Sequence, residues 1–326
     1  MITLDKIKLV SALDSVSIVK AGAFEKIVKQ GVTMSESFTQ ISPYRLYVKK
    51  DYENGETVIE FTGKILMDMY PELINRENFR HCLECINRLG VCEIDMDSVI
   101  RDGRVCVADV TRDVLCIDPS GLSEWVRTNI SNHRKYLVRN IGGNLVVEKN
   151  VKTKGYKRRL TIYDKGKELN RADNHDFIFS LADPDKVLSY FDGRVRFEFN
   201  LNSKAAIRQS LGIADTSVAE VLNSEANPIR DFVDDIISDV SENPVCNSLK
   251  DRKNLAFLRD CDMDMCKVEA EIRKYCSKKS KPSQLMEPFR ELWNRLNSTK
   301  DSAHSKGELL NMLLEIAILF PLLVWA

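Results

Sequence analysis

The chain has 326 residues, of which 44% are hydrophobic and 29% are charged, and its formal net charge is zero. This length allows one large domain or two ordinary ones, and the composition is that of a soluble protein with a proper core. The zero net charge argues against a protein that binds nucleic acid through its overall charge alone.

The charge is unevenly distributed along the chain. From Arg127 to Arg171 there are 13 Lys and Arg against 3 Asp and Glu, whereas from Ala214 to Met265 there are 5 basic against 12 acidic residues. The first segment is suited to face a polyanion, and the second would repel one.

The predicted elements begin with a poorly patterned stretch. The first forty residues combine a short apolar segment with helix-like spacing around Phe24 and Ile27. Residues 44–48 alternate as a strand, and residues 58–65 read as its hairpin partner. A helix then carries apolar positions three or four residues apart from Phe79 onwards, with Asn75 as its cap and Gly90 as its end.

The middle of the chain alternates between strands and helices. We predict a helix from about Ser120 to Val138 and the strands 91–94, 104–110, 144–148, 157–163 and 194–201. The first two of these strands are joined by a turn at residues 101–103. This order predicts an α+β fold, in which an antiparallel sheet of split-βαβ type is covered by helices.

The pattern turns helical from Lys204 onwards. We predict a catalytic domain over residues 1–215 and a helical region over 216–326, with a polar linker at 240–264 and helices at 266–275, 285–296 and 307–319. The apolar end, residues 316–326, is too short to span a bilayer, and no targeting segment is visible. We therefore expect no membrane partner.

The chain contains nine cysteines, an odd number. Several lie in apolar segments, which is typical of reduced core thiols, and this favours a cytoplasmic protein. Cys82 and Cys85 have zinc-like spacing, but no second pair accompanies them.

Tyr163 is the strongest candidate for chemistry. It ends the basic strand 157–163 and precedes Lys165, Lys167 and Glu168. In the strand 194–201, alternation puts Arg196 and Glu198 on the polar face, and Tyr163 would share that face if the two strands lie in one sheet. A phenol beside cations and carboxylates has the parts needed to attack a phosphodiester. The alternative is an ordinary amphipathic strand pair with a solvated, ion-paired face.

Asp109 interrupts a strand that is otherwise apolar on both faces. A carboxylate there must be hydrogen-bonded, paired or metal-bound. As a metal ligand it would need further oxygens, for which Glu198, Asp113, Asp95 and Asp97 are the candidates. No two of the four histidines lie close together in the sequence, so a carboxylate site favours Mg²⁺ or Mn²⁺ over zinc.

Three segments together resemble a known family. They are VADVTRD (107–113), LTIYDKGKE (160–168) and RVRFEF (194–199), followed by SLGI (210–213). In this order they are similar to the replication initiators of filamentous phages (the gene II and gene X type) and of plasmids that replicate by rolling circle. The resemblance covers about residues 44–213.

The resemblance implies a site-specific endonuclease that nicks one strand at an origin and keeps the 5′ phosphate on a tyrosine. Tyr163 would be the nucleophile, with Tyr156 as a second candidate, and Lys165 or Lys167 would balance the phosphate charge. Asp109, Glu198 and Glu168 are then candidates for metal binding or proton transfer.

DNA would be the main partner, and a host helicase and self-association are further candidates. The residues expected to hold DNA are Lys152, Lys154, Lys157, Arg158, Arg159 and Arg196. About six neutralised phosphates give a slope of roughly −5 for log affinity against log salt. The alternatives are a mobilisation relaxase or transposase with the same chemistry, a non-catalytic DNA-binding module, and a structural or interaction protein.

Overall fold

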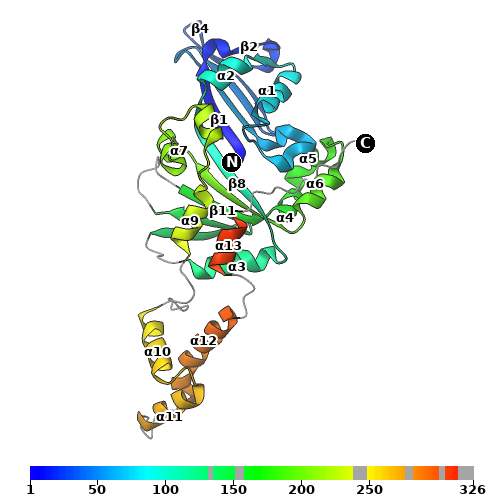
Figure 1. Cartoon of the computed structure of the whole chain (residues 1–326). Helices are drawn as coiled ribbons and strands as arrows, with labels where there is room; N and C mark the ends of the chain where they lie inside the picture. The colour runs from blue at the N-terminus through cyan, green and yellow to red at the C-terminus, as the bar shows by residue number, and fades with distance from the viewer. Residues whose placement is uncertain (131–134, 151–157, 238–247, 276–281, 301–304, 315–326) are drawn as a thin grey trace.

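The computed structural model describes residues 1–130, 135–150, 158–237, 248–275, 282–300 and 305–314. Its centre is a ten-stranded antiparallel sheet with the order β3-β4-β5-β6-β1-β8-β12-β11-β10-β9 (Figure 1). The predicted α+β class, antiparallel sheet and helical C-terminal region are confirmed.

The large sheet consists of two halves with the same strand order. Strand β1 is followed by the run β3 to β6, whose last strand returns beside β1, and β8 is followed by β9 to β12, whose last strand returns beside β8. Strands β1 and β8 pair with each other at the centre. The strands are β1 (Leu4–Ala12), β3 (Glu25–Lys29), β4 (Val32–Gln40), β5 (Leu46–Asp51), β6 (Glu56–Thr62), β8 (Arg104–Leu115), β9 (Tyr136–Ile141), β10 (Asn144–Lys149), β11 (Arg158–Asp164) and β12 (Arg194–Leu201).

One face of the sheet carries the main core. The helices that contribute to it are α1 (Phe79–Arg88), α2 (Met96–Asp102), α3 (Pro119–Asn129), α7 (Lys204–Leu211), α8 (Val218–Asn223), α9 (Pro228–Ile236) and α13 (Lys306–Met312). Helices α8 and α9, which follow residue 215, therefore share the core of the sheet.

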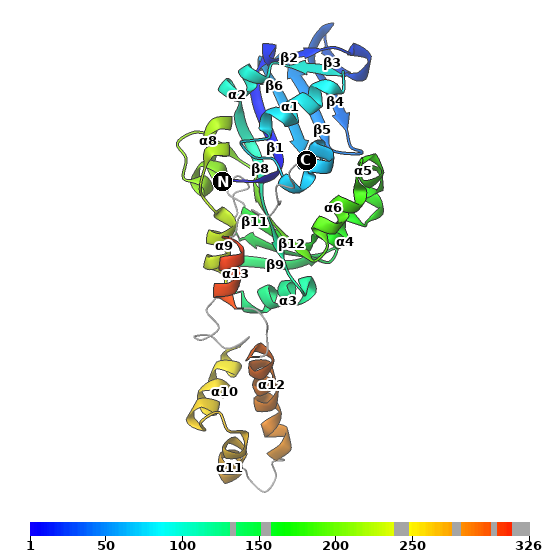
Figure 2. The same ribbon diagram turned by 45° about the vertical axis from the view of Figure 1, so that its right-hand side comes forward.

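A smaller core lies beside the opposite face. It is formed by the 3₁₀ segment η3 (Gly63–Glu72) and the short helices α4 (Lys165–Leu169), α5 (His175–Ser180) and α6 (Pro184–Phe191). Figure 2 shows α5 and α6 on the other side of the middle strands from α8 and α9. These elements cover one end of the polar face of the sheet.

Alternation along β12 explains how this strand separates the two faces. Val195, Phe197 and Phe199 are buried in the main core, whereas Glu198 and Asn200 point to the opposite, polar face. Neighbouring strands repeat the pattern, so polar side chains from β8, β11 and β12 meet on the same face.

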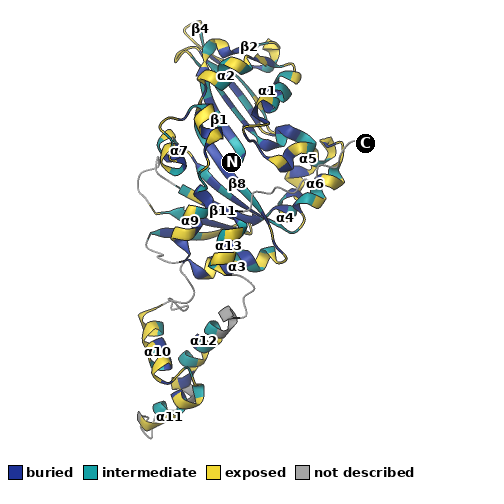
Figure 3. Ribbon diagram, viewed as in Figure 1, coloured by how far each residue is buried: buried dark blue, intermediate teal, exposed yellow. Residues whose placement is uncertain are grey.

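Helices α10 (Leu249–Asp260), α11 (Met265–Tyr275) and α12 (Pro282–Lys300) form a unit around a core of their own. Its buried members are Leu255, Leu258, Cys261, Val268, Met286 and Leu292. Figure 3 shows mostly exposed and intermediate residues on these three helices, in contrast to the buried strands of the sheet.

Four sequence predictions of local structure were wrong. The stretch after Phe24, for which the spacing suggested a helix, forms strands β3 and β4. The side chains of β3 are all exposed, so its sequence shows no apolar alternation that would predict a strand. The predicted linker at 240–264 contains α10, whose apolar residues face only the small α10–α12 core.

The other two errors concern connections. Residues 92–94 form β7, which pairs with β2 (Val16–Ile18) outside the large sheet. The connection from β7 to β8 is helix α2 and not the predicted turn. The predicted helix 120–138 ends at Asn129, and Tyr136 begins strand β9.

The apolar segment 316–326 lies outside the described residues. Among the helices that the structure describes, none combines the length and apolar character needed to cross a membrane.

Candidate active site

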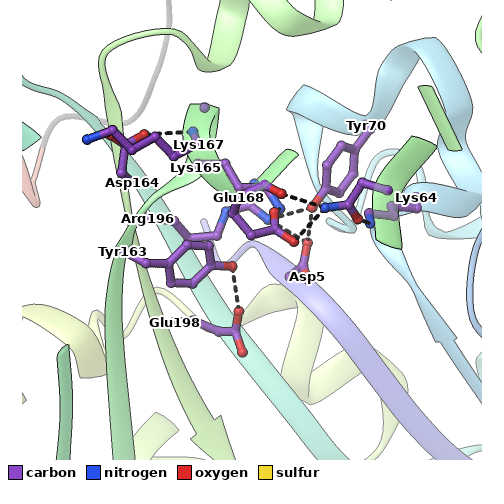
Figure 4. A network of polar contacts seen from close by, with 12 residues as sticks. Asp5, Lys64, Tyr70, Tyr163, Asp164, Lys165, Lys167, Glu168, Arg196 and Glu198 are labelled. Atoms are coloured by element: carbon purple, nitrogen blue, oxygen red, sulfur yellow. Dashed lines mark hydrogen bonds and ion pairs between the residues drawn. The ribbon is translucent and has the colours of Figure 1, made fainter. Parts of the chain in front are cut away.

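Tyr163 lies on the polar face at the end of β11. It stands opposite Arg196 in β12, and Thr161 stands opposite Glu198. The Tyr163 hydroxyl donates a hydrogen bond to Glu198 Oε2 at 3.0 Å (Figure 4). The expected shared face of these two side chains is thus present in the structure.

Arg196 was expected to contact DNA, and the structure contradicts this. Its side chain is fully buried; Nε and Nη2 donate to the two carboxylate oxygens of Asp113 at 2.7 and 2.8 Å. Nη1 donates to Asp5 and to the hydroxyl of Tyr70, each at 2.7 Å. A buried guanidinium group whose three nitrogens all donate to protein groups links secondary-structure elements. It is not available to bind a phosphate.

The same contacts correct the expectation that Asp113 is a metal ligand. Both of its oxygens are engaged by the guanidinium of Arg196, so it balances a buried charge and is not a candidate metal ligand. A strand aspartate opposite an arginine in the neighbouring strand gives the same sequence pattern as a metal ligand, and only the register distinguishes the two.

Lys165 and Lys167 point in different directions. Lys165 is buried, its ammonium lies 5.8 Å from the centre of the Tyr163 ring, and it forms an ion pair of 2.5 Å with Glu168. Lys167 is exposed and pairs with Asp164 at 3.2 Å, away from Tyr163 (Figure 4). Of the two, Lys165 is therefore the one that lies near the Tyr163 ring.

Glu168 belongs to a group of alternating charges around Lys165. Burial opposes its ionisation, but Lys165 and Lys64 hold the pKa of Glu168 below its usual value. Burial and the nearby Lys165 lower the pKa of Lys64 to about 8, and its ammonium donates to Asn174. Two lysines from distant parts of the chain, Lys64 and Lys165, thus act on the same carboxylate, that of Glu168.

Asp109 and Glu198 form the second group of acids. Burial raises the pKa of Asp109 to about 6, although Asn200 donates a hydrogen bond to it. Burial, then the charges of Asp5 and Asp109, raise the pKa of Glu198 to about 7. A buried carboxyl group whose pKa is raised by neighbouring acids suits either a held proton or a bound cation.

The donor set is compatible with a hard cation. Mg²⁺ needs only one or two carboxylates besides water and substrate phosphate, and Asp109 and Glu198 supply two. No ready-made group of three or more His, Cys, Asp or Glu ligands is present among the described residues. The residues therefore fit Mg²⁺ or Mn²⁺ held jointly with a substrate.

Three residues of the site were missed from the sequence: Asp5, Lys64 and Tyr70. Asp5 is the second residue of β1, and the other two lie in η3. Tyr70 is fully buried and donates to Asp5 at 2.8 Å. No local pattern marks them, because they reach Tyr163 only through the pairing of β1 with β8 and the packing of η3 on α6. We call these three residues together with Tyr163, Lys165, Glu168, Arg196 and Glu198 the Tyr163 cluster.

The expected DNA contacts in β11 are only partly described. Arg159 is exposed and alternates onto the face of Tyr163, whereas Arg158 points to the opposite face and is half-buried. Lys152, Lys154 and Lys157, like the alternative nucleophile Tyr156, lie outside the described residues.

Tyr163 is a buried phenol that lies beside a carboxyl group. Burial and the charge of Glu198 raise the pKa of Tyr163 well above its usual value, so the phenol keeps its proton near neutral pH. Glu198 lies within hydrogen-bond distance of that proton, and the charge of Arg196 opposes part of the rise in the pKa of Tyr163.

The comparisons with known proteins add no assignment. No family model, no curated protein and no solved structure matches the chain at a significant level.

Proposed function

We propose that the chain nicks DNA through a covalent 5′-phosphotyrosine and transfers the strand, as a rolling-circle replication initiator does. The observation that carries this proposal is the hydrogen bond from Tyr163 to Glu198 inside a cluster that also contains Lys165. A nucleophile, its base and a cation are the minimum set for attack on a phosphodiester.

The arrangement of strands supports the family resemblance. The three segments that resemble the initiators lie on neighbouring strands, β8, β12 and β11. Asp109, Glu198 and Tyr163 from these strands share one face. This arrangement supports our proposal that the sheet is of the Rep endonuclease-like split-βαβ type.

The proposed reaction begins when Glu198 accepts the phenolic proton of Tyr163. The phenolate oxygen attacks the scissile phosphorus and forms a tyrosine–phosphate bond, while the bond to the 3′ oxygen breaks and that oxygen leaves and takes up a proton. Mg²⁺ or Mn²⁺ held by Asp109 would supply positive charge to the phosphate, which leaves Glu198 free to serve as the base. Lys165 balances charge near the phenolate, and Arg196 positions the strands that carry these groups.

The test is a search for a covalent adduct. We expect purified protein to nick supercoiled DNA of its own replicon in the presence of Mg²⁺ or Mn²⁺, and to leave an adduct that resists SDS. Tyr163→Phe should lose the adduct entirely, because only the attacking oxygen is removed.

Tyr136→Phe is the matched control. Its hydroxyl also contacts a carboxylate, that of Asp235, but it lies in β9 outside the Tyr163 cluster. An adduct that persists in Tyr163→Phe would move the nucleophile to Tyr156 or another residue. DNA binding without nicking or adduct would leave only a DNA-binding module.

The substrate distinguishes the related functions. Nicking of a plasmid that carries the replicon's origin indicates an initiator or a mobilisation relaxase, and cleavage at transposon ends indicates a transposase with the same chemistry.

A further inference from the structure

A polar pocket of about 350 Å³ lies next to the Tyr163 cluster but outside it. It is formed by α3, by the turn between β9 and β10, and by α4 with the residues that follow it. This volume is at the lower end of the range for pockets that hold a small ligand. We call it the α3–α4 pocket.

Three basic side chains reach this pocket from separate parts of the chain: Arg127, Lys167 and Arg171. Arg127 pairs with Glu124, and Lys167 pairs with Asp164. Both acids also line the pocket, so the lining has a net charge of +1. Because an arginine has five N–H donors and a lysine three, each keeps donors for a further anion.

The remaining polar groups suit the other parts of a nucleotide. Asn140, Asn144 and Ser123 are among the residues that line the pocket, and the Ser123 hydroxyl donates to the backbone carbonyl of Pro119. The oxygen of Asn140 accepts from the backbone of Gly143, which leaves its NH₂ group to donate. Amides of this kind recognise base edges, while guanidinium groups bind phosphate.

Helix α4 links the pocket to Tyr163. Lys165 points toward the Tyr163 ring, and Lys167, two residues later, lines the pocket. A strand whose scissile phosphate lies at Tyr163 can thus continue past the end of β11 and place a neighbouring nucleotide between α3 and α4.

We propose that the α3–α4 pocket binds one nucleotide of the DNA strand that is cut, with its phosphate on Arg127, Lys167 and Arg171 and its base against Asn140 and Asn144. This rests on the proposed nicking function and names a substrate subsite for it.

The test compares two double variants in the binding of thymidine oligonucleotides of increasing length. Arg127→Ala with Arg171→Ala should weaken binding of the longer oligonucleotides about tenfold, which corresponds to about 1.4 kcal/mol for the two side chains together. The salt slope should fall by about 0.7 or less, since both arginines bind the same phosphate and one phosphate on a single strand contributes about 0.7.

Arg80→Ala with Arg101→Ala is the matched control. Both arginines are exposed and paired with a carboxylate, and they lie in α1 and α2, away from the pocket (Figure 1). Arg171→Lys, which keeps the charge, should retain most of the affinity. Thermal unfolding of each variant checks that the fold is intact.

The outcomes separate this subsite from the nicking function. An affinity loss confined to the pocket variant supports the subsite, even if the wild-type protein forms no Tyr163 adduct. Equal affinity in wild type and pocket variant overturns the subsite, even if the adduct forms. A wild-type protein that binds no oligonucleotide overturns it as well.

Discussion

At the scale of single residues, Tyr163 and Glu198 share a hydrogen bond while the pKa of each is raised. A phenol that holds its proton tightly needs a base, and a carboxyl group with a pKa of about 7 changes its charge near physiological pH. The pair therefore couples the reactivity of the tyrosine to the ionisation of the glutamate.

This coupling predicts a pH dependence. We expect the rate of adduct formation to rise with pH and to level off above about pH 7, because ionised Glu198 accepts the proton. Glu198→Gln should lower the rate by about 10²-fold or more and remove the rise near pH 7. Single-turnover adduct formation from pH 5.5 to 9 measures both, and an unchanged pH profile in the variant would reject Glu198 as the base.

The raised pKa of Asp109 predicts how the free energy of unfolding depends on pH. Its folded pKa of about 6 lies above the reference value of 3.8, so the fold favours the protonated form. Burial of the charged form therefore lowers stability as pH rises from about 4 to 6, by about 3 kcal/mol in total. Asp109→Asn should be more stable than wild type by about that amount at pH 8, and the difference should shrink as pH falls toward 4.

Urea denaturation at several pH values checks this prediction. If Asp109 helps to hold a divalent ion, Mg²⁺ should raise the stability of wild type at pH 8 and have little effect on Asp109→Asn. A variant less stable than wild type at every pH would show that the ionised carboxylate is structurally required.

At the scale of elements, β12, which buries one face, was predicted, whereas the fully exposed strand β3 was missed; β1 was missed too, although it buries one face. Residues 194–201 were predicted with the bounds that β12 has, because Val195, Phe197 and Phe199 alternate with polar side chains. The exposed strand β3 has no such alternation. Alternation of apolar and polar residues indicates a strand that buries one face. An edge strand that buries little has no such alternation in its sequence.

A substitution in the separate core of helices α10 to α12 tests whether this unit unfolds independently of the sheet. Leu258 is fully buried in their separate core. Leu258→Ala should cost about 2 to 5 kcal/mol within this unit. Hydrogen exchange should accelerate in α10, α11 and α12 while the amides of β12 keep their protection.

Leu249→Ala is the control, since Leu249 begins the same helix and is 71% exposed. Faster exchange in β12 as well would show that the helical unit and the sheet unfold together.

At the scale of the whole molecule, Arg196 joins the two halves of the sheet. It contacts Asp113 of β8 and Asp5 of β1, and it reaches Tyr70 of η3. Removing it leaves two acids in the interior without their partner. We expect Arg196→Met to lower the free energy of unfolding by about 3 to 5 kcal/mol.

Arg194→Met is the control for this change, because Arg194 lies in the same strand, is partly exposed and stacks on Tyr190 at 4.1 Å. Urea denaturation of the two variants should differ clearly. A similar, small loss in both would mean that Arg196 is replaceable by packing.

The sequence by itself determined the fold class, the alternation that puts Glu198 and Arg196 on one face of β12, and the choice of Tyr163 as the residue to test. It did not determine which charges meet there. Asp5 and Arg196 are 191 positions apart, and Arg196 looked like a DNA contact until the register placed it between two acids. Alternation is a local property of a strand, but neighbours across a sheet depend on strand order and register, which the burial of the whole core decides.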